Sequence, residues 1–380
     1  MKRFLIFSVA YHPFVGGAEI AVKEITDRIT NIQFDMITIN LDGKQKAEEQ
    51  IGNVHVYRIG RQGKLSKLFF PFTACLKAGE LHKKNKYDAI WSIMASFSGF
   101  AAVFFKMMHS KIPFILNLQE GDPIPYIKRQ VWFVYPLFQQ IFRRANVIHA
   151  LSHYLADFAR DMGAKGIVEV IPNGVNPELF SKQYSPEEIK IIRTELGLFP
   201  EDKVLITTSR LVKKNGVGDV IATLPLLPEQ VKFVIIGIGK LEEELKAQVK
   251  ALNLERRVVF AGLKPNNNLP GYLAASDIFI RPSLSEGQGI SFIEAMAAGI
   301  PIIATPVGGI PDFLKDNETG LFCEVQNPKS IAEKVTMLLE NPELRATLTK
   351  NAKALVAEKY NWDLIAEMMK IKVFSIHLDT

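Results

Sequence analysis

Short, almost continuously apolar runs, each followed by a stretch with helical spacing, constrain the fold of this chain most. Strands that are apolar throughout, rather than alternating, are typical of parallel strands covered on both faces. Residues 18–29 and 126–144 carry the spacing of covering helices. The alternation predicts a doubly wound α/β sheet. The first series of runs is FLIFSVA (4–10), FDMITIN (34–40), AIWSIM (89–94), PFILNL (113–118) and NVIHALS (146–152).

A second series begins after turn-forming residues between 172 and 184, which include Asn173-Gly174. Ser185, matched by Glu188, predicts a capped helix start there. The second series is VLITTSR (204–210), KFVIIGIG (232–239), VVFAGL (258–263), DIFIRPS (277–283) and PIIATPV (301–307).

Two such series in 380 residues predict two Rossmann-like domains. We expect residues 1–175 to form the first and residues 176–360 the second, with a C-terminal helix over residues 361–380 packing back on the first. The carboxyl ends of the strands are then the places to look for ligands.

Charge and hydropathy limit the ligands and the cellular setting that suit this chain. Residues 1–180 hold 22 Lys and Arg against 15 Asp and Glu, whereas residues 181–380 hold 24 against 25. A basic first half favours an anionic ligand or surface, although a solvated surface rich in lysine fits equally well. Cys75 and Cys323 lie too far apart to indicate a metal site or a disulfide framework, and a reducing cytoplasm is the simplest setting. The 17 uncharged residues between Asp88 and Lys106 read as a strand and a helix rather than a membrane span.

Two loops after predicted strands have residues suited to phosphate. Gly16-Gly17 follows the first strand and precedes a helix, where paired glycines allow close approach of an anion, although such a turn is often only structural. Arg210, Lys213 and Lys214 follow a strand of the second series. Their charges suit a diphosphate, or make a solvated basic turn.

The segment from Arg281 to Gly309 is the most informative. Glu286 lies in a glycine-rich loop, and Glu294 lies about one turn into the next helix. A carboxylate such as Glu294 can accept hydrogen bonds from vicinal ribose hydroxyls. The helix start offers backbone amides to phosphate or sugar oxygens. These amides belong to Gln288, Gly289, Ile290 and Ser291.

Over nearly its whole length the chain resembles a family 4 glycosyltransferase of the GT-B fold. The resemblance is carried by VGGAE (15–19), IPNGV (171–175), SRLVKKNG (209–216) and the stretch from Gly262 through SEGQG (285–289) to FIEAMAAGIPIIATPVGGIPD (292–312). The last block is highly specific. It implies a retaining hexosyl transfer from a UDP- or GDP-sugar, by front-face attack assisted by the leaving phosphate.

The resemblance also implies residue roles. Glu286 matches a glutamate near the donor sugar and phosphate, and Glu294 the glutamate that holds the ribose. Arg210 and Lys214 match the basic pair on the diphosphate, which Gly16 and Gly17 face. The lysine lies one residue closer to its arginine than in many relatives, so Lys213 is the alternative to Lys214. The backbone of Gly262, Leu263 and Lys264 matches the turn that binds the base.

One departure concerns the loop after PFILNL, where many members have a histidine. This chain has Gln119-Glu120-Gly121-Asp122. Glu120 is the nearest match in place and could orient the sugar or an acceptor hydroxyl; Asp122 or a merely structural turn before Pro123 are the alternatives. His12 and His149 are other candidates, and His149 reads better as a satisfied core histidine.

No Asp-x-Asp motif occurs, so we expect no obligatory metal ion and no cofactor beyond the donor substrate. The implied acceptor is a glycan or a lipid-linked molecule, as in polysaccharide or glycolipid synthesis, and no nucleic-acid motif is present. Residues 64–72 and 126–144 mix basic with large apolar side chains, which suits either packed amphipathic helices or peripheral contact with the inner face of the cytoplasmic membrane. A GT-B sugar-nucleotide epimerase and a nucleotide-sugar-binding protein without transferase activity are the alternative functions.

Overall fold

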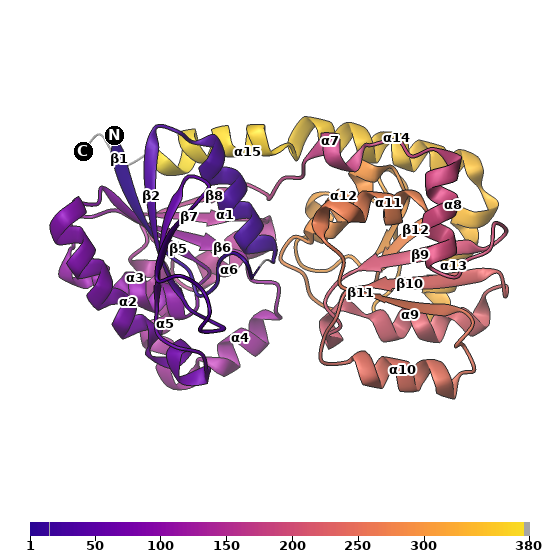
Figure 1. Cartoon of the computed structure of the whole chain (residues 1–380), viewed down its shortest axis with the longest axis horizontal. Helices are drawn as coiled ribbons and strands as arrows, with labels where there is room; N and C mark the ends of the chain where they lie inside the picture. The colour runs from indigo at the N-terminus through magenta and orange to yellow at the C-terminus, as the bar shows by residue number, and fades with distance from the viewer. Residues whose placement is uncertain (15, 376–380) are drawn as a thin grey trace. The chain divides into compact units, whose positions relative to one another are not determined.

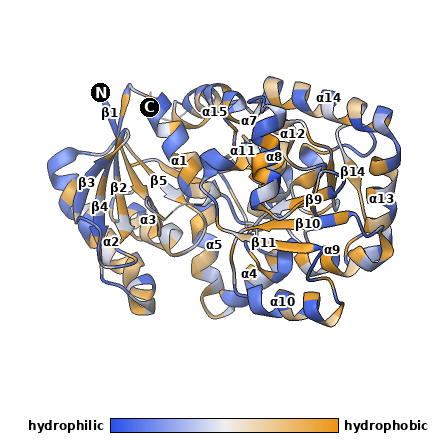
Figure 2. Ribbon diagram, turned by 45° about the vertical axis from the view of Figure 1, so that its right-hand side comes forward, coloured by the Kyte–Doolittle hydropathy of each residue, from blue (hydrophilic) through white to orange (hydrophobic). Residues whose placement is uncertain are grey.

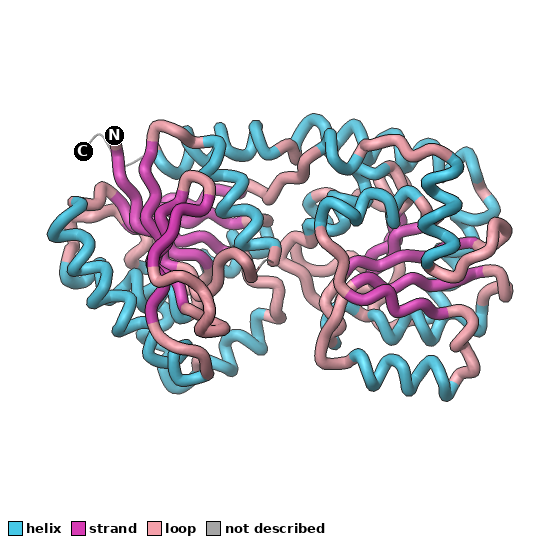
Figure 3. The backbone as a smooth tube through the Cα atoms, viewed as in Figure 1, coloured by secondary structure: helices cyan, strands magenta, loops and turns pink. Residues whose placement is uncertain are grey.

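The computed structural model describes residues 1–14 and 16–375. The chain forms two compact units. The first comprises Met1–Asn173 together with the C-terminal segment from Trp362, and the second comprises Gly174–Asn361. Each unit is built on one sheet with helices on both faces, as Figures 1 and 3 show. The predicted α/β fold class is therefore confirmed.

The sheet of the first unit has the strand order β3-β4-β2-β1-β5-β6-β7-β8. Every neighbouring pair is parallel except β3 and β4. All five strands expected from the apolar runs are present. The strands are β1 (Lys2–Phe7), β2 (Ile32–Ile39), β3 (Glu48–Ile51), β4 (Val54–Ile59), β5 (Ala89–Ile93), β6 (Phe114–Leu118), β7 (Val147–Ala150) and β8 (Ile167–Val170).

Helices cover both faces of this sheet. An apolar cluster lies on each face of the sheet, one under α1 and α15 and the other under α2, α3, α5 and α6. The helices of the unit are α1 (Gly17–Arg28), α2 (Lys64–Asn85), α3 (Phe97–Met108), α4 (Ile124–Gln130), α5 (Tyr135–Arg143), α6 (His153–Asp161) and α15 (Trp362–Met369), with the short turns η1 (Trp132–Val134) and η6 (Lys370–Phe374).

The single helix expected over residues 126–144 is wrong. The segment is split into α4, η1 and α5. Pro136 explains the break, because it lacks the amide hydrogen that a continuous helix would need and lies at the start of α5. By contrast, the uncharged stretch after Asp88 forms β5 and α3, as expected. Across the described part of the chain, none of the helices has the length and apolar character needed to span a bilayer.

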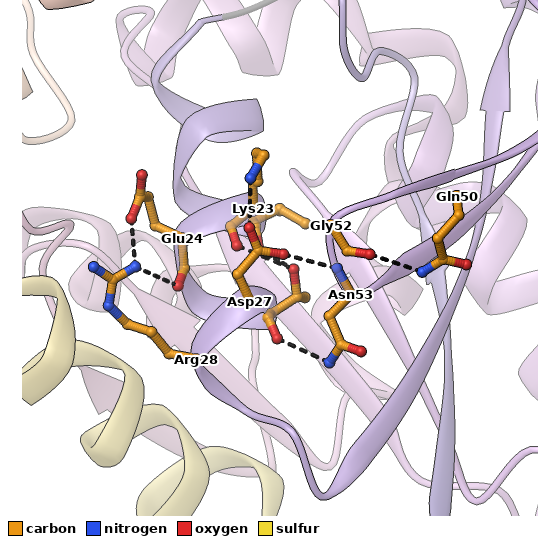
Figure 4. A network of polar contacts seen from close by, with 9 residues as sticks. Lys23, Glu24, Asp27, Arg28, Gln50, Gly52 and Asn53 are labelled. Atoms are coloured by element: carbon orange, nitrogen blue, oxygen red, sulfur yellow. Dashed lines mark hydrogen bonds and ion pairs between the residues drawn. The ribbon is translucent and has the colours of Figure 1, made fainter.

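A polar network fixes the end of α1 against the sheet, as Figure 4 shows. The side-chain amide of Asn53 donates to the carbonyl oxygens of Thr26 and Ile29, at 3.0 and 2.9 Å. Asp27 accepts from the backbone amide of Asn53 at 2.8 Å and forms an ion pair with Lys23. These bonds satisfy carbonyl groups that a helix end leaves without partners, so they position α1 and the glycine loop before it.

The sheet of the second unit has the order β11-β10-β9-β12-β13-β14, and all its pairs are parallel. Its strands are mostly apolar, as the largely orange β9, β10 and β11 in Figure 2 show. All five predicted strands are again confirmed. The strands are β9 (Lys203–Thr208), β10 (Val231–Ile236), β11 (Val258–Gly262), β12 (Ile278–Arg281), β13 (Ile302–Ala304) and β14 (Leu321–Phe322).

Helices also cover both faces of the second sheet. Ser185 caps α8 by accepting from the amide of Glu188 at 3.2 Å, while the Glu188 carboxylate accepts from the amide of Ser185, as predicted. The helices are α7 (Pro177–Phe180), α8 (Pro186–Glu195), α9 (Val217–Thr223), α10 (Glu242–Ala251), α11 (Leu269–Ala274), α12 (Ile290–Ala298), α13 (Pro328–Glu340) and α14 (Pro342–Lys359), with the short turns η2 (Lys213–Asn215), η3 (Leu224–Leu226), η4 (Asn266–Asn268) and η5 (Ile310–Asp312).

Phe374 anchors the C-terminal segment in the first unit. Its ring lies 5.1 Å from that of Trp91, 5.3 Å from Phe4 and 6.1 Å from Phe34, centroid to centroid. We predict that Phe374→Ala lowers the unfolding free energy of this unit by about 3–4 kcal/mol, because it leaves a cavity in the core. The control, Ile371→Ala at an exposed position, should change it by less than about 0.5 kcal/mol. Urea unfolding followed by tryptophan fluorescence tests both; equal midpoints for the two variants would contradict the packing.

Candidate functional site

The candidate site of the second unit lies at the carboxyl ends of its parallel strands. The loops after β9, β12 and β13 approach each other closely there. Leu284 donates its amide to the carbonyl of Lys214 at 2.6 Å, and Gly309 donates to the carbonyl of Glu286 at 3.0 Å. A methyl group added at Gly308 would lie 1.9 Å from that same Glu286 oxygen, so glycine is required. The backbone of the Glu286 loop is thereby held in place.

Arg281, the last residue of β12, lies at the centre of these loops. It is 6% exposed. One guanidinium nitrogen donates to the Glu286 carboxylate at 2.6 Å, and another donates to the Ser291 hydroxyl at 2.7 Å. The guanidinium also lies 4.3 Å from the ring centroid of Phe292. Burial lowers the pKa of Arg281, against the opposing effect of Glu286 and Glu294, and the charge of Arg210 acts in the same direction as burial.

Glu286 is therefore oriented from both sides of its side chain. Its Oε2 accepts from Arg281, and its Oε1 accepts from the amide of Gly287 at 3.2 Å. A bidentate-capable guanidinium paired with a carboxylate fixes the direction of that carboxylate. The sequence singled out Glu286 but not Arg281, although a basic residue closing an otherwise apolar strand was a usable signal.

Glu294 lies at the middle of α12 and is 8% exposed. Burial raises its pKa to about 7, while the nearby positive charge of Arg281 opposes that rise. A carboxyl group in this state accepts or donates hydrogen bonds readily near neutral pH. The geometry fits an acceptor for vicinal hydroxyl groups.

The start of α12 lies beside this carboxyl group. Gly289 precedes the helix with φ +89°, and an added methyl group there would meet Phe292 and Arg281 within 2.9 Å. The first amides of a helix have no partner within it, which applies to Ile290 and Ser291. The structure thus brings together Glu286, Glu294, and the segment Gln288–Ser291.

Arg210 and Lys214 lie in the loop after β9. Arg210 is exposed, whereas Lys214 is partly buried. The loop is tied down by Asn215, whose side-chain amide donates to the carbonyl of Arg210 at 2.7 Å. Lys213 is exposed, and Lys214 forms the backbone contact with the Glu286 loop. Of the two lysines, Lys214 is therefore the one whose backbone is fixed beside the loop that carries Glu286.

The turn from Gly262 to Lys264 follows β11. Gly262 has φ +69°, and Leu263 is exposed. The Lys264 ammonium donates to Glu195 at 3.1 Å and lies 5.0 Å from the ring centroid of Tyr272. Hydrogen bonds from Lys264 and Tyr272 hold the pKa of Glu195 below its usual range. The side chain of Lys264 is thus held to Glu195 and Tyr272, while its backbone remains the part suited to recognition.

In the first unit, Gly16 and Gly17 open α1 and are exposed. The amide of Gly16 donates to the Glu19 carboxylate at 2.7 Å. This bond was not expected from the sequence. A phosphate bound to that amide would have to displace the Glu19 side chain, since two anions cannot share one donor at this range.

The loop after β6 contains Glu120, which the sequence placed at the position of an expected histidine. Its Oε1 accepts from the amide of Ala95 at 2.5 Å, whereas its Oε2 is buried without a hydrogen-bond partner. Burial, with a smaller contribution from the charge of Asp122, raises the pKa of Glu120 to about 7 against the lowering effect of backbone hydrogen bonds such as that from Ala95. Asp122 is exposed. The carboxyl group of Glu120 joins the ends of β5 and β6.

Gln119 is locked beside it. Its side chain donates to Asn117 at 2.6 Å and accepts from Asn173 at 3.2 Å. His149 completes the chain of contacts: its Nε2 donates to the carbonyl of Ile171 and its Nδ1 accepts from Asn117, both at 2.7 Å. Burial lowers the pKa of His149 to about 4. It is a satisfied core histidine, as the sequence predicted.

Comparison with known proteins shows the family. Residues 16–174 match the family of glycosyl transferase 4-like domains, and residues 188–355 match the glycosyl transferases of group 1. The chain belongs to the family 4 type of GT-B glycosyltransferases. The resemblance carried by the sequence motifs is thereby confirmed.

Individual relatives agree. An uncharacterized glycosyltransferase of Methanocaldococcus jannaschii is 29% identical over 96% of this chain and 95% of its own length. A GDP-mannose-dependent α-(1-6)-phosphatidylinositol monomannoside mannosyltransferase of Mycobacterium tuberculosis is 28% identical, covering 96% of each chain. The fold matches Anabaena HepE, crystallised with UDP-glucose, at a TM-score of 0.82 and 21% identity, covering 99% of this chain and 100% of that one.

The buried carboxyl group of Glu294 makes the stability of the glycosyltransferase depend on pH. Because burial raises its pKa from 4.5 to about 7, ionising Glu294 destabilises the folded state above pH 7 but not below pH 4.5. We predict that Glu294→Gln, relative to the wild type, gains about 2–3 kcal/mol of unfolding free energy between pH 5 and pH 8. Urea unfolding at the two pH values measures this; a difference that does not change with pH would contradict it.

Proposed function

We propose that this glycosyltransferase moves a hexose from a UDP- or GDP-sugar to a glycan or lipid-linked acceptor, with retention at the anomeric carbon and without an obligatory metal ion. The observation that carries the proposal is the buried Arg281–Glu286 pair, with Glu294 and the Arg210 loop around it at one strand edge. Such a site presents fixed charges of both signs where a charged leaving group can be held.

The residues divide the work by their chemistry. Arg210 and Lys214 neutralise the charge that develops on the leaving diphosphate, since both are cationic and fixed to one loop. Glu294 accepts from the ribose hydroxyls. The amides of Gln288–Ser291 bind phosphate or sugar oxygens, and Glu286 orients the donor sugar.

Other predicted residues have supporting roles. The backbone of Gly262–Lys264 contacts the base, because the side chain of Lys264 is already held by Glu195. Phosphate binding by the amide of Gly16 requires the Glu19 side chain to move away first. Glu120 positions the end of the first unit's sheet through its bond to Ala95, so that sugar or acceptor hydroxyls can be oriented there.

The donor choice rests on the relatives. The mycobacterial relative is named for its dependence on GDP-mannose, and the Anabaena structure contains UDP-glucose. A panel of UDP- and GDP-hexoses, assayed with and without glycolipid acceptors, tests the proposal. The anomeric configuration of the product, read by proton NMR, tests retention. Conversion of the donor sugar without any acceptor would point to an epimerase instead.

We predict that Arg210→Ala lowers kcat about 100- to 1000-fold with the preferred donor, because the developing charge on the diphosphate loses its counter-charge. The matched control is Arg256→Ala, an exposed arginine on the loop before β11, which should leave kcat within about twofold. Steady-state kinetics measure both. Equal activity of the two variants would remove Arg210 from the site.

We also predict that excess EDTA leaves the transfer rate unchanged, because the cationic side chains take the place of a metal ion in this proposal. After dialysis against the chelator, added Mg²⁺ or Mn²⁺ should also leave the transfer rate unchanged. A loss of activity with EDTA that either metal reverses would overturn the metal-independent mechanism.

A further inference from the structure

The outer face of α2 has an apolar stripe that the core of the first unit does not use. The stripe comprises five side chains, each more than half exposed: Leu65, Leu68, Phe69, Phe72 and Leu76. At 100° per residue these positions lie on one side of the helix. They extend over three turns, or about 16 Å.

The opposite side of α2 is the one that packs. Its buried residues include Phe70, Ala74, Ala78 and Leu81, which belong to the core cluster under α2 and α3. The average direction of these residues is about 180° from that of the stripe. Folding therefore explains one face of α2 and leaves the other unexplained. Single exposed apolar residues are common, but a continuous stripe of this kind marks an interaction site.

The neighbouring helix extends the exposed apolar surface. Phe72 stacks on Phe104 of α3, with ring centroids 5.2 Å apart. Met107 and Met108, at the end of α3, are also more than half exposed. Since α2 and α3 pack against each other along the same face of the sheet, their exposed residues belong to one side of the unit.

The charge of this helical layer indicates what it meets. Residues 61–144 hold 13 Lys and Arg against 4 Asp and Glu. From Arg61 to Gly79, around the stripe, four basic residues occur and no acidic one. The helices of the other face, residues 17–28 and 362–375, hold four basic and five acidic residues. The positive charge is thus concentrated on the side that carries the stripe.

We propose that the α2 stripe, with Met107 and Met108, docks on a bilayer rich in anionic phospholipid. Large apolar side chains flanked by basic ones suit the boundary between headgroups and acyl chains, where such a helix lies in the plane of the membrane. Anionic headgroups attract the surrounding lysines and arginines. A second copy of the chain fits less well, because it would bring two positively charged surfaces together.

This docking does not require the transfer reaction, but it gives a lipid-linked acceptor of the proposed function a place to approach the first unit. Binding to vesicles and transfer to a water-soluble acceptor are therefore separate measurements. Failure of one does not imply failure of the other.

The test is co-sedimentation with vesicles of phosphatidylcholine alone, or containing about one-third phosphatidylglycerol. We expect binding to the anionic vesicles only, with at least a tenfold weaker affinity in Leu68→Ser/Phe69→Ser. The matched control, Ile191→Ser/Phe199→Ser, removes two equally exposed apolar residues from the second unit and should bind like the wild type. Both double variants should keep the wild-type Tm and the rate with a soluble acceptor, since exposed positions contribute little to stability.

A fluorescent reporter tests directly whether the stripe itself contacts the bilayer. In a Trp132→Phe background the remaining tryptophans, Trp91 and Trp362, are buried. Leu68→Trp should then shift its emission to shorter wavelength with anionic vesicles, and Ile191→Trp should not. An unshifted Leu68→Trp, equal binding by the Leu68→Ser/Phe69→Ser variant, or a dimer that the same variant dissociates in the absence of vesicle binding, would each overturn the proposal.

Discussion

The buried guanidinium of Arg281 is the group on which the candidate site depends. A charge removed from water must be compensated, and Glu286 supplies the ion pair while Ser291 and Phe292 supply a hydrogen bond and a ring face. The same contacts fix the Glu286 loop and the start of α12 with respect to β12. Close backbone packing at Gly308 adds a second constraint on that loop. These protein contacts organise the site.

This arrangement also sets the protonation of its neighbours. Burial keeps the pKa of Glu294 near 7 even though Arg281 lies close by. The guanidinium bonds directly to Glu286, whereas it acts on Glu294 only through its charge. Glu286 is thus held in direction by a bond, and Glu294 is left able to respond to a ligand. A bound ribose would supply the hydrogen bonds that Glu294 lacks in an apolar surrounding.

Much of the fold followed from local patterns, because a strand buried on both faces is apolar at most positions rather than at alternate ones. β9 and β10 are of this kind and were predicted. β4 was not, since its residues alternate between buried and partly exposed and the strand lies near the sheet edge. The helix over 126–144 was drawn too long because apolar spacing continues through Pro136. An apolar pattern indicates which positions are buried, but it does not account for the amide hydrogen that Pro136 lacks.

The candidate site was predictable where its residues lie close together in the sequence. Glu286 and Glu294 share one loop and helix, so their spacing was visible. Contacts between distant segments were not, as with Gln119, which is held by Asn117 and Asn173. The Glu19 carboxylate also accepts a hydrogen bond from the amide of Gly16. The spacing of these residues does not indicate whether such a capping carboxylate competes with a ligand.

Hydrogen exchange with a nucleotide diphosphate tests the central claim most directly, because it reads the site without knowledge of acceptor or sugar. UDP or GDP should slow amide exchange in residues 286–292 and 210–216 of the wild type. The protection should be lost in Glu294→Ala. Protection confined to other segments, or unchanged exchange at a nucleotide concentration that inhibits transfer, would contradict a donor site built around Arg281.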